Sequence, residues 1–343
     1  MKIAIVTINN PSLEAAKKLL PYLKDHDCSI FNKALEENKF YKFDKVDDIL
    51  PTAWIEFDAI IFIMATGAVI RKIAPYLKDK ATDPAVLIMT LDLKRVIPLL
   101  SGHLGGANEL ANQLVEEIED CVNFVTTASD QIKVLSFDMY AKKNGYLISN
   151  LKSLAEVSNA IINKKKVHVI TYPSLIKEIK EFEGYKEENF DFFMPDDLTC
   201  LDDTIPRVYI TPQKLSNNYL QIHPKDISIG LGMNRGTSKK EISLAVQRFC
   251  FEHNLNIDDI INISSFTAKE DEEGLLEYAK GKKLLFFNED EINALEQEFS
   301  PSQASKFFNI KGVAEPASLL ASKNKTLFLS KRIYGSVTIA ASF

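Results

Sequence analysis

The chain has few cysteines, four in 343 residues, and they lie far apart at positions 28, 121, 200 and 250. No CxxC pair and no Cys/His spacing typical of a metal site occurs, so the sequence predicts neither a zinc motif nor a disulfide framework. Isolated thiols of this kind are typical of a reducing compartment. We therefore expect a cytoplasmic protein with no metal site of its own.

Long hydrophobic runs are also missing. The longest apolar run, residues 59–70, is too short to cross a bilayer, and Met1–Ile8 is too short for a signal-peptide core and predicts a first buried strand instead. The chain has no basic run, a net charge of −6 and a pI of about 5.6. We therefore expect neither nucleic acid nor a membrane as a partner.

Apolar residues make up 46% of the chain, enough for sizeable cores, and a length of 343 residues predicts two or three domains. Apolar strand-like runs alternate with helical patterns in residues 1–145 and again in residues 223–343. This alternation predicts an α/β fold: two α/β domains with mostly parallel sheets, joined by a less regular middle α/β region over residues 146–222.

A glycine-rich stretch at residues 98–110 stands out, because three of the 13 glycines fall within residues 102–106. Residues 95–100 predict a short strand, and apolar residues at helical spacing predict a helix from 107 to 118. A helix that begins behind such a turn favours an anion, because its first N–H groups lack partners within the helix. His103 lies on this turn, where an imidazole suits general acid–base catalysis. The alternative is a tight turn with a structural histidine.

A similar strand, glycine turn and helix comes earlier in the chain, where residues 58–64 are followed by Thr66 and Gly67. Ligands of parallel α/β sheets bind beyond the carboxyl ends of the strands. We expect Thr66-Gly67 and the turn at 101–106 both to lie at such ends. Arg71, one turn into the helix, is placed to reach an anion there; the alternative is a solvated surface arginine.

The middle region is less informative, and we assign it no chemistry. Residues 177–197 are charge-rich and predict a surface excursion. His168 falls within a predicted strand and is expected to be structural, while His223 is expected to lie in a linker.

The last domain opens with residues 226–238, which again predict a strand, a glycine turn and the start of a helix. Gly230, Gly232 and Gly236 have the spacing GxGxxxG, which keeps an NADPH-dependent reductase as an alternative, although a lone glycine pattern is a weak signal. The strand that follows ends without the acidic residue that would bind a ribose, which speaks against a nicotinamide site.

Three runs of the first domain, residues 67–75, 80–86 and 96–108, closely resemble the CbiG family, the cobalt-precorrin-5A hydrolases of anaerobic cobalamin biosynthesis. The resemblance continues in the last domain at Arg235-Gly236-Thr237, at the stretch 269–275 and at residues 312–315. Met233-Asn234 departs from the cysteine and arginine usual in the family, which removes one cation near the expected carboxylate site.

The resemblance implies a hydrolase that opens the δ-lactone of cobalt-precorrin-5A, a cobalt tetrapyrrole. The two-carbon fragment would leave as acetaldehyde, giving cobalt-precorrin-5B. No cofactor is implied, because the substrate itself carries the cobalt. Other enzymes of the cobalamin pathway are candidate protein partners, and the oligomeric state stays open. A tetrapyrrole-binding carrier without turnover is a third class of function, beside the hydrolase and the reductase.

We expect the carboxylates of such a substrate to bind at the two glycine turns. His103 is the candidate general base, and Glu109 takes that role if the histidine is only structural. The expected substrate-binding residues are Thr66, Gly67, Arg71, Ser101, Gly102, Gly105, Gly106, Asn108, Gly232, Arg235, Gly236, Thr237, Lys269 and Glu315.

Overall fold

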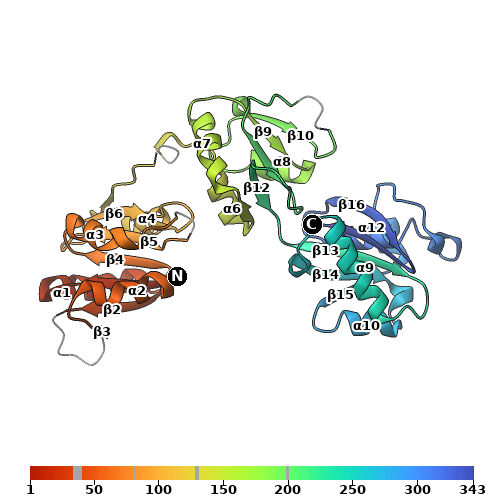
Figure 1. Cartoon of the computed structure of the whole chain (residues 1–343), viewed down its shortest axis with the longest axis horizontal. Helices are drawn as coiled ribbons and strands as arrows, with labels where there is room; N and C mark the ends of the chain where they lie inside the picture. The colour runs from red at the N-terminus through yellow and green to blue at the C-terminus, as the bar shows by residue number, and fades with distance from the viewer. Residues whose placement is uncertain (34–40, 80–81, 128–130, 198–200) are drawn as a thin grey trace. The chain divides into compact units, whose positions relative to one another are not determined.

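The computed structural model of the chain describes residues 1–33, 41–79, 82–127, 131–197 and 201–343. Residues 80–81 of the CbiG-like runs and Cys200 lie outside the described residues. The chain divides into two compact units, Met1–Lys133 and Val134–Phe343, with one sheet in the first and two in the second (Figure 1). The predicted α/β class with mostly parallel sheets is confirmed.

The first unit contains a seven-stranded sheet with the order β3-β2-β1-β4-β5-β6-β7, in which only the β5–β6 pair is antiparallel. Its strands are β1 (Lys2–Thr7), β2 (Asp27–Asn32), β3 (Tyr41–Lys42), β4 (Ala59–Ile63), β5 (Ala85–Met89), β6 (Arg95–Leu100) and β7 (Val122–Asn123), and its helices are α1 (Asn10–Leu19), α2 (Val46–Glu56), α3 (Thr66–Ile73) and α4 (Ala107–Glu117).

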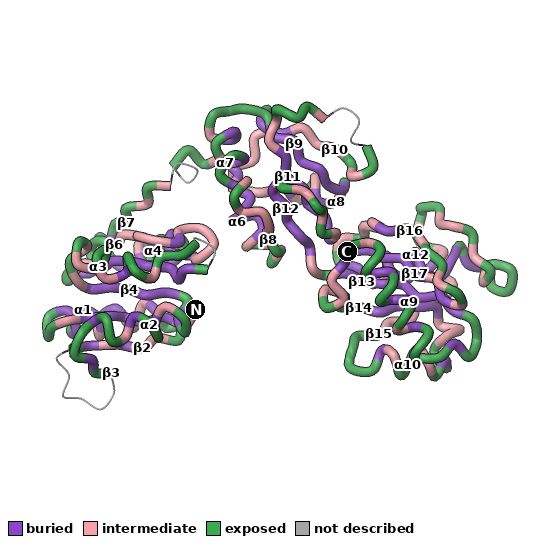
Figure 2. Tube along the Cα trace, in the orientation of Figure 1, coloured by how far each residue is buried: buried purple, intermediate pink, exposed green. Residues whose placement is uncertain are grey.

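The central strands of this sheet are buried on both faces (Figure 2). Successive residues of a strand point to opposite faces. Ile3 and Ile5 therefore share a core with α1 and α4, while Ala4 and Val6 share another with α2 and α3. Two-sided burial explains why β4 and β5 are continuous apolar runs in the sequence.

The middle region is more regular than its sequence suggests. It has a five-stranded sheet with the order β10-β9-β11-β12-β8, parallel except for the β12–β8 pair. Its elements are α6 (Phe137–Asn144), β8 (Leu147–Ser149), α7 (Leu154–Ile162), β9 (Val167–Ile170), α8 (Pro173–Lys180), β10 (Phe190–Phe193), β11 (Arg207–Ile210) and β12 (Leu220–His223).

Two expectations for this region were wrong. The segment 177–197, expected to be a surface excursion, contains the strand β10, because Phe190, between Asn189 and Asp191, packs into the core. His223, expected in a linker, is the last residue of β12 and is only 4% exposed.

The last part of the chain forms a mixed five-stranded sheet with the order β15-β14-β13-β17-β16, in which β13, β14 and β15 are parallel. Its strands are β13 (Ile227–Met233), β14 (Ile260–Phe266), β15 (Lys283–Phe287), β16 (Leu327–Tyr334) and β17 (Val337–Ser342), and its helices are α9 (Lys239–Glu252), α10 (Glu273–Tyr278), α11 (Glu289–Asn293) and α12 (Ala314–Ala321). Short 3₁₀ helices lie at Leu20–Leu23, Ala74–Tyr76, Leu151–Ser153, Glu187–Asn189, Ile257–Asp259, Thr267–Lys269 and Gln303–Lys306.

Gly230 and Gly232 lie inside β13 and not in a turn. The residues that alternate with them, among them Ile229 and Leu231, share a core with α9. A Cβ at Gly230 would lie 1.8 Å from the carbonyl oxygen of Ala314, so the glycine is required by the close approach of α12 to the strand.

We expect Gly230→Ala to lower the free energy of unfolding by roughly 3 kcal/mol, because the added methyl group meets main-chain atoms that cannot move aside. Gly312→Ala is the matched control, since its Cβ would find only ordinary contacts of 3.6 Å and longer. This control should stay within about 1 kcal/mol of the wild type. Urea unfolding followed by circular dichroism measures both variants, and equal stabilities would contradict the close packing of α12.

Candidate active site

The glycine turn between β6 and α4 is closed by its own main chain. The N–H groups of Ala107 and Asn108, the first two of α4, donate to the carbonyl oxygens of Ser101 and Gly102 at 3.2 and 3.0 Å. The Ser101 hydroxyl donates to the carbonyl oxygen of Asp83 at 2.9 Å and ties the turn to the residues before β5. The first two N–H groups that the sequence offered to an anion therefore already have partners within the turn.

The glycines of this turn meet steric needs of the chain itself. A Cβ at Gly105 would lie 2.5 Å from the Cβ of Ser101, and one at Gly102 would lie 2.7 Å from the side-chain oxygen of Asn108. Gly106 has φ of +88°, in the left-handed region that favours glycine. Close packing accounts for Gly102 and Gly105, and the positive φ accounts for Gly106, so none of the three needs a ligand to explain it.

The two candidate catalytic residues both lie at this turn. His103 is half-buried, and its carbonyl oxygen accepts the N–H of Gly106 at 3.0 Å. Glu109 is exposed in the first turn of α4. Asn108 is buried, and its amide donates to the Thr127 hydroxyl at 3.2 Å, so its side chain is held in place.

The antiparallel direction of β6 separates two groups of expected site residues. Leu100 pairs with Val86, which places the turn at 101–106 beside the start of β5. Thr66 and Gly67 instead follow the carboxyl end of β4, which is parallel to β5. Each turn follows the carboxyl end of its own strand, as expected, but the reversal of β6 puts the two turns at opposite ends of the sheet, so they do not share one ligand-binding end.

A signal for this reversal is present in the sequence. Only five residues, 90–94, connect β5 to β6, whereas a parallel crossover needs about a dozen or more. At the carboxyl edge, Arg71 is exposed and its guanidinium donates to the Gly67 carbonyl oxygen at 2.9 Å. Arg71 and Gly67 are thus in contact with each other, at the end of the sheet opposite to the turn that carries His103.

The second glycine turn, between β13 and α9, is organised around Glu272. This carboxylate is 4% exposed and accepts the Gly236 N–H at 3.0 Å and the Lys269 ammonium at 3.0 Å. The Nε of Arg235 lies 3.2 Å from it. Three expected substrate-binding residues, Arg235, Gly236 and Lys269, are therefore brought together by a fourth residue that was not among the expected ligands.

The electrostatics of this cluster favour an ionised Glu272. Burial alone would raise the pKa of its carboxyl group, but the bond from Gly236 and the charges of Lys269 and Arg235 outweigh burial and lower it. Arg235 also pairs with the exposed Asp271, whose pKa is lowered by that contact. Two cations and two carboxylates leave the cluster formally neutral, so it is not a ready-made anion site.

The segment 269–275 folds directly onto this turn. A Cβ at Gly274 would lie 2.1 Å from the Thr237 carbonyl oxygen, so the start of α10 touches the turn backbone. The Thr237 hydroxyl donates to the Asn234 carbonyl oxygen at 2.8 Å. Arg235-Gly236-Thr237 and the stretch 269–275, both of which resemble the CbiG family, are therefore in direct contact, and this contact constrains both sequences.

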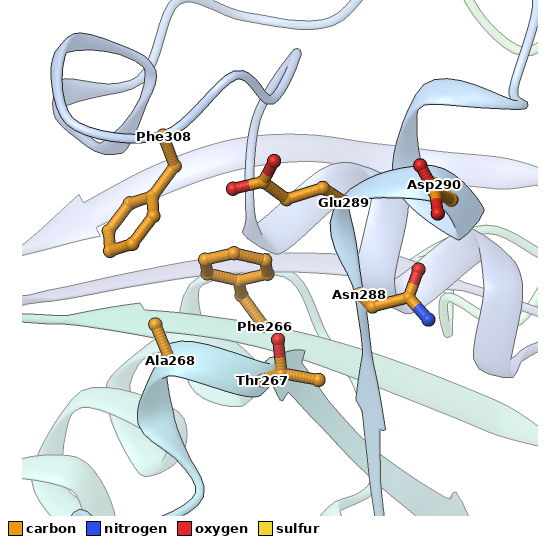
Figure 3. A pocket seen from close by; sticks show the side chains of 7 residues that line it. All are labelled: Phe266, Thr267, Ala268, Asn288, Glu289, Asp290 and Phe308. Carbon is orange, nitrogen blue, oxygen red and sulfur yellow. The ribbon is translucent and has the colours of Figure 1, made fainter.

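A hollow of about 590 Å³ lies where β14 and β15 end (Figure 3). Figure 3 shows the Glu289 carboxylate pointing toward the rings of Phe266 and Phe308. The Ala268 carbonyl oxygen, on its wall, accepts the Arg235 guanidinium at 2.8 Å, so the hollow adjoins the Glu272 cluster. The described residues that line it carry two carboxylates and no lysine or arginine: Phe266, Thr267, Ala268, Asn288, Glu289, Asp290 and Phe308.

Two other expected ligands are engaged inside the protein. Glu315 is 3% exposed, and its carboxylate accepts the N–H of Ser300 at 2.6 Å and the N–H of Lys331 at 2.8 Å. The carbonyl oxygen of Gly232 accepts the Thr338 hydroxyl at 3.2 Å. Both therefore hold elements of the C-terminal sheet together.

Among the described residues, no group of three or more His, Cys, Asp or Glu is placed to hold a metal ion. Within that same part of the chain, no helix is long and apolar enough to cross a membrane.

Three family models cover most of the sequence. They are described as cobalamin synthesis G N-terminal, cobalamin biosynthesis central region and cobalamin synthesis G C-terminus, and they match residues 48–130, 135–224 and 227–342. The chain belongs to the CbiG family.

Similar proteins match over almost the whole length of this CbiG-family chain. A cobalt-precorrin-5A hydrolase from Priestia megaterium is 30% identical, covering 99% of this chain and 94% of that protein. Another, from Salmonella typhimurium, is 28% identical, covering 98% and 96%. The crystal structure of a putative cobalamin biosynthesis protein G homolog from Sulfolobus solfataricus is 22% identical with a TM-score of 0.40, covering 99% and 96%. Because these near full-length relatives are named as hydrolases, this CbiG-family protein is a hydrolase.

Replacing the carboxylate of Glu272 tests its role in the C-terminal turn of the CbiG-family protein. Glu272→Gln removes the charge that Lys269 and Gly236 bind, and we expect a loss of about 1.5–3 kcal/mol in the free energy of unfolding at neutral pH. Asp271→Asn is the matched control, because the contact of this exposed carboxylate with Arg235 is screened by solvent and its loss should leave the stability nearly unchanged.

The pH dependence gives a second readout for the same variant. Because the pKa of Glu272 is lower in the folded protein, its stabilisation is present above the ordinary carboxyl pKa and is lost as the pH falls through the lowered value. The deficit of Glu272→Gln should therefore shrink in acid. A deficit that stayed constant with pH would show that the charge of Glu272 does not stabilise the fold.

Proposed function

We propose that this CbiG-family hydrolase acts on cobalt-precorrin-5A, opens its δ-lactone and releases the two-carbon fragment as acetaldehyde, leaving cobalt-precorrin-5B. Near full-length similarity to proteins named cobalt-precorrin-5A hydrolase supports this substrate. The observation in the chain itself that carries the proposal is the closed turn that holds His103 half-buried at the start of α4.

The proposed chemistry begins with a hydroxide equivalent at the lactone carbonyl. In this scheme the neutral imidazole of His103 takes a proton from water as the water attacks, and the ring C–O bond breaks. The imidazolium returns the proton to the leaving oxygen. Release of acetaldehyde then breaks the carbon–carbon bond that joins the two-carbon fragment to the macrocycle: the hydroxyl loses its proton as it becomes the aldehyde carbonyl, and the macrocycle carbon takes up a proton. Glu109, exposed on the same turn, takes the role of base if His103 only supports the turn.

Binding of the substrate carboxylates has to rely on a few local cations, because the net charge of the chain is −6. Arg71 is exposed at its end of the first sheet. Arg235 is paired with Asp271, whose side chain is 72% exposed, so a substrate carboxylate would bind there by taking the place of Asp271. We propose no resident cofactor, since the cobalt enters within the substrate.

The two alternative functions make different use of the same protein. A reductase has less support, because Gly230 and Gly232 lie in β13 and not in a turn that could receive a pyrophosphate. A carrier would bind the tetrapyrrole without turnover. Anaerobic incubation with cobalt-precorrin-5A distinguishes the three: acetaldehyde without added NADPH supports the hydrolase, binding without product supports the carrier, and a need for NADPH supports the reductase.

The variant His103→Asn tests the general base. Loss of a general base lowers a rate by about 10²–10⁴-fold, so acetaldehyde release should fall by that factor while fold and substrate binding are kept. His26→Asn is the control in the same unit, because that ring contacts the Gln113 side chain at 3.0 Å, away from the turn. A His103→Asn enzyme that kept more than roughly a tenth of the wild-type rate would assign the histidine a structural role.

Arg71 offers the cleanest test of substrate binding. A charged side chain at Gly106 would confuse binding with folding, because the positive φ there strains any substitution. Arg71→Gln should weaken substrate binding roughly two- to fivefold, as expected for an exposed ionic contact of about 0.5–1 kcal/mol. Lys72→Gln, whose side chain pairs with Asp47, is the neighbouring control and should leave affinity unchanged in an anaerobic absorbance titration. Equal affinities for all three proteins would remove Arg71 from the binding site.

A further inference from the structure

The middle sheet has helices on one face only among its described elements. Residues of α6, α7 and α8 all pack into the same core, together with every second residue of the strands. The residues that alternate with this core point to the other face, where loops cover them. They include polar side chains that the proposed function does not use: Ser149, His168, Asp191, Arg207, Gln221 and His223.

Ser149 and His223 form a hydrogen-bonded pair on this second face. The hydroxyl oxygen of Ser149 lies 2.9 Å from Nε2 of His223, and Nδ1 of His223 lies 3.0 Å from the carbonyl oxygen of Thr211. A carbonyl oxygen can only accept, so Nδ1 carries the ring proton. Nε2 is therefore the acceptor, and the Ser149 hydroxyl donates to it.

The surroundings of the pair favour a neutral imidazole at His223 and leave Ser149 the less buried of the two residues. His223 is 4% exposed, whereas Ser149 is half-buried, so the serine is the more accessible residue of the pair. Burial lowers the pKa of His223 against the opposing effect of the Thr211 bond, and the nearby Lys214 lowers it further. A neutral imidazole fixed in this tautomer has the state that a general base requires.

Three other serines, one near Ser149 and two on β14, lack this arrangement. The hydroxyls of Ser153, Ser264 and Ser265 donate to main-chain carbonyl oxygens. Asn150, directly after Ser149, has φ of +57°, and its amide donates to the carbonyl oxygens of Asn217 and Tyr219, both at 2.8 Å. The loop over this face is thus fixed beside the serine.

We propose that Ser149 is an activated nucleophile with His223 as its general base, and that the pair cleaves a carboxylic ester or lactone through an acyl-serine. The logic is that of a serine–histidine hydrolase, with the Thr211 carbonyl oxygen in the orienting position usually held by a carboxylate. This activity goes beyond the proposed function and does not depend on it. A δ-lactone is nevertheless a cyclic ester, and so belongs to the class of carbonyl compound that such a pair could cleave.

The reaction balances without any further reagent. The Ser149 oxygen bonds to the carbonyl carbon while its proton passes to Nε2 of His223. The bond from that carbon to the alcohol oxygen breaks, and the leaving oxygen takes the proton. Water then attacks the acyl-serine with His223 again as the base, which releases the carboxylic acid and restores the hydroxyl.

Labelling with a fluorophosphonate, followed by mass spectrometry of the whole protein and of its peptides, tests the proposal on the full chain. We expect one phosphonyl group on Ser149, no adduct there in Ser149→Ala, and an unchanged adduct in the matched control Ser153→Ala. His223→Gln should slow labelling at least tenfold, in line with the loss of a general base.

Absence of an adduct at Ser149 in the wild type would overturn the proposal, and so would an equal labelling rate in a folded His223→Gln variant. The wild-type measurement decides by itself if His223→Gln does not fold. No cobalt substrate enters this experiment, so its failure leaves the proposed lactone hydrolase untouched, and failure of acetaldehyde release leaves the serine assignment untouched.

Discussion

The short connection between β5 and β6 determines the layout of the first unit. A link of five residues cannot carry the chain back along the sheet, so β6 has to run antiparallel to β5. That reversal puts the turn with His103 at the edge where β5 begins, while Thr66, Gly67 and Arg71 follow the end of β4. The residues proposed for catalysis and for anion binding in this unit thus lie at two separate places, and a mechanism that used both would require the substrate to contact them independently.

Each glycine turn satisfies much of its own hydrogen bonding. In the first, carbonyl oxygens at Ser101 and Gly102 accept the first two N–H groups of α4. In the second, the Glu272 carboxylate accepts the Gly236 N–H and neutralises Lys269. Such internally closed turns are rigid platforms for a side chain. In the proposed mechanism the first turn would hold the His103 side chain in one position, which matters because a misplaced base loses much of its effect.

Much of the fold followed from the sequence. Apolar runs of five to seven residues predicted the buried strands β4 and β5, and helical spacing predicted α4 almost to the residue. The middle sheet was underestimated, because β8 and β10 are short and polar residues alternate with their core residues. The pairing of Ser149 with His223 joins residues 74 positions apart on antiparallel strands, a register that periodicity alone does not give.

The candidate site residues were less predictable than the fold, for an electrostatic reason. Arg235 and Lys269 stood out in the sequence as cations, yet the buried Glu272 and the exposed Asp271 leave that cluster formally neutral. The adjoining hollow adds Glu289 and Asp290, so a substrate rich in carboxylates is repelled from it.

That repulsion bears on how the proposed tetrapyrrole substrate would bind at the C-terminal sheet. In that proposal its carboxylates would be favoured where Arg235 can exchange partners, because the Asp271 side chain is exposed while Glu272 is held by three groups. The acidic hollow excludes carboxylates from the side bounded by Ala268 and Glu289. Attraction at one point and repulsion beside it orient a ligand more narrowly than a broad positive surface would, and an acidic protein can select an acidic substrate in this way.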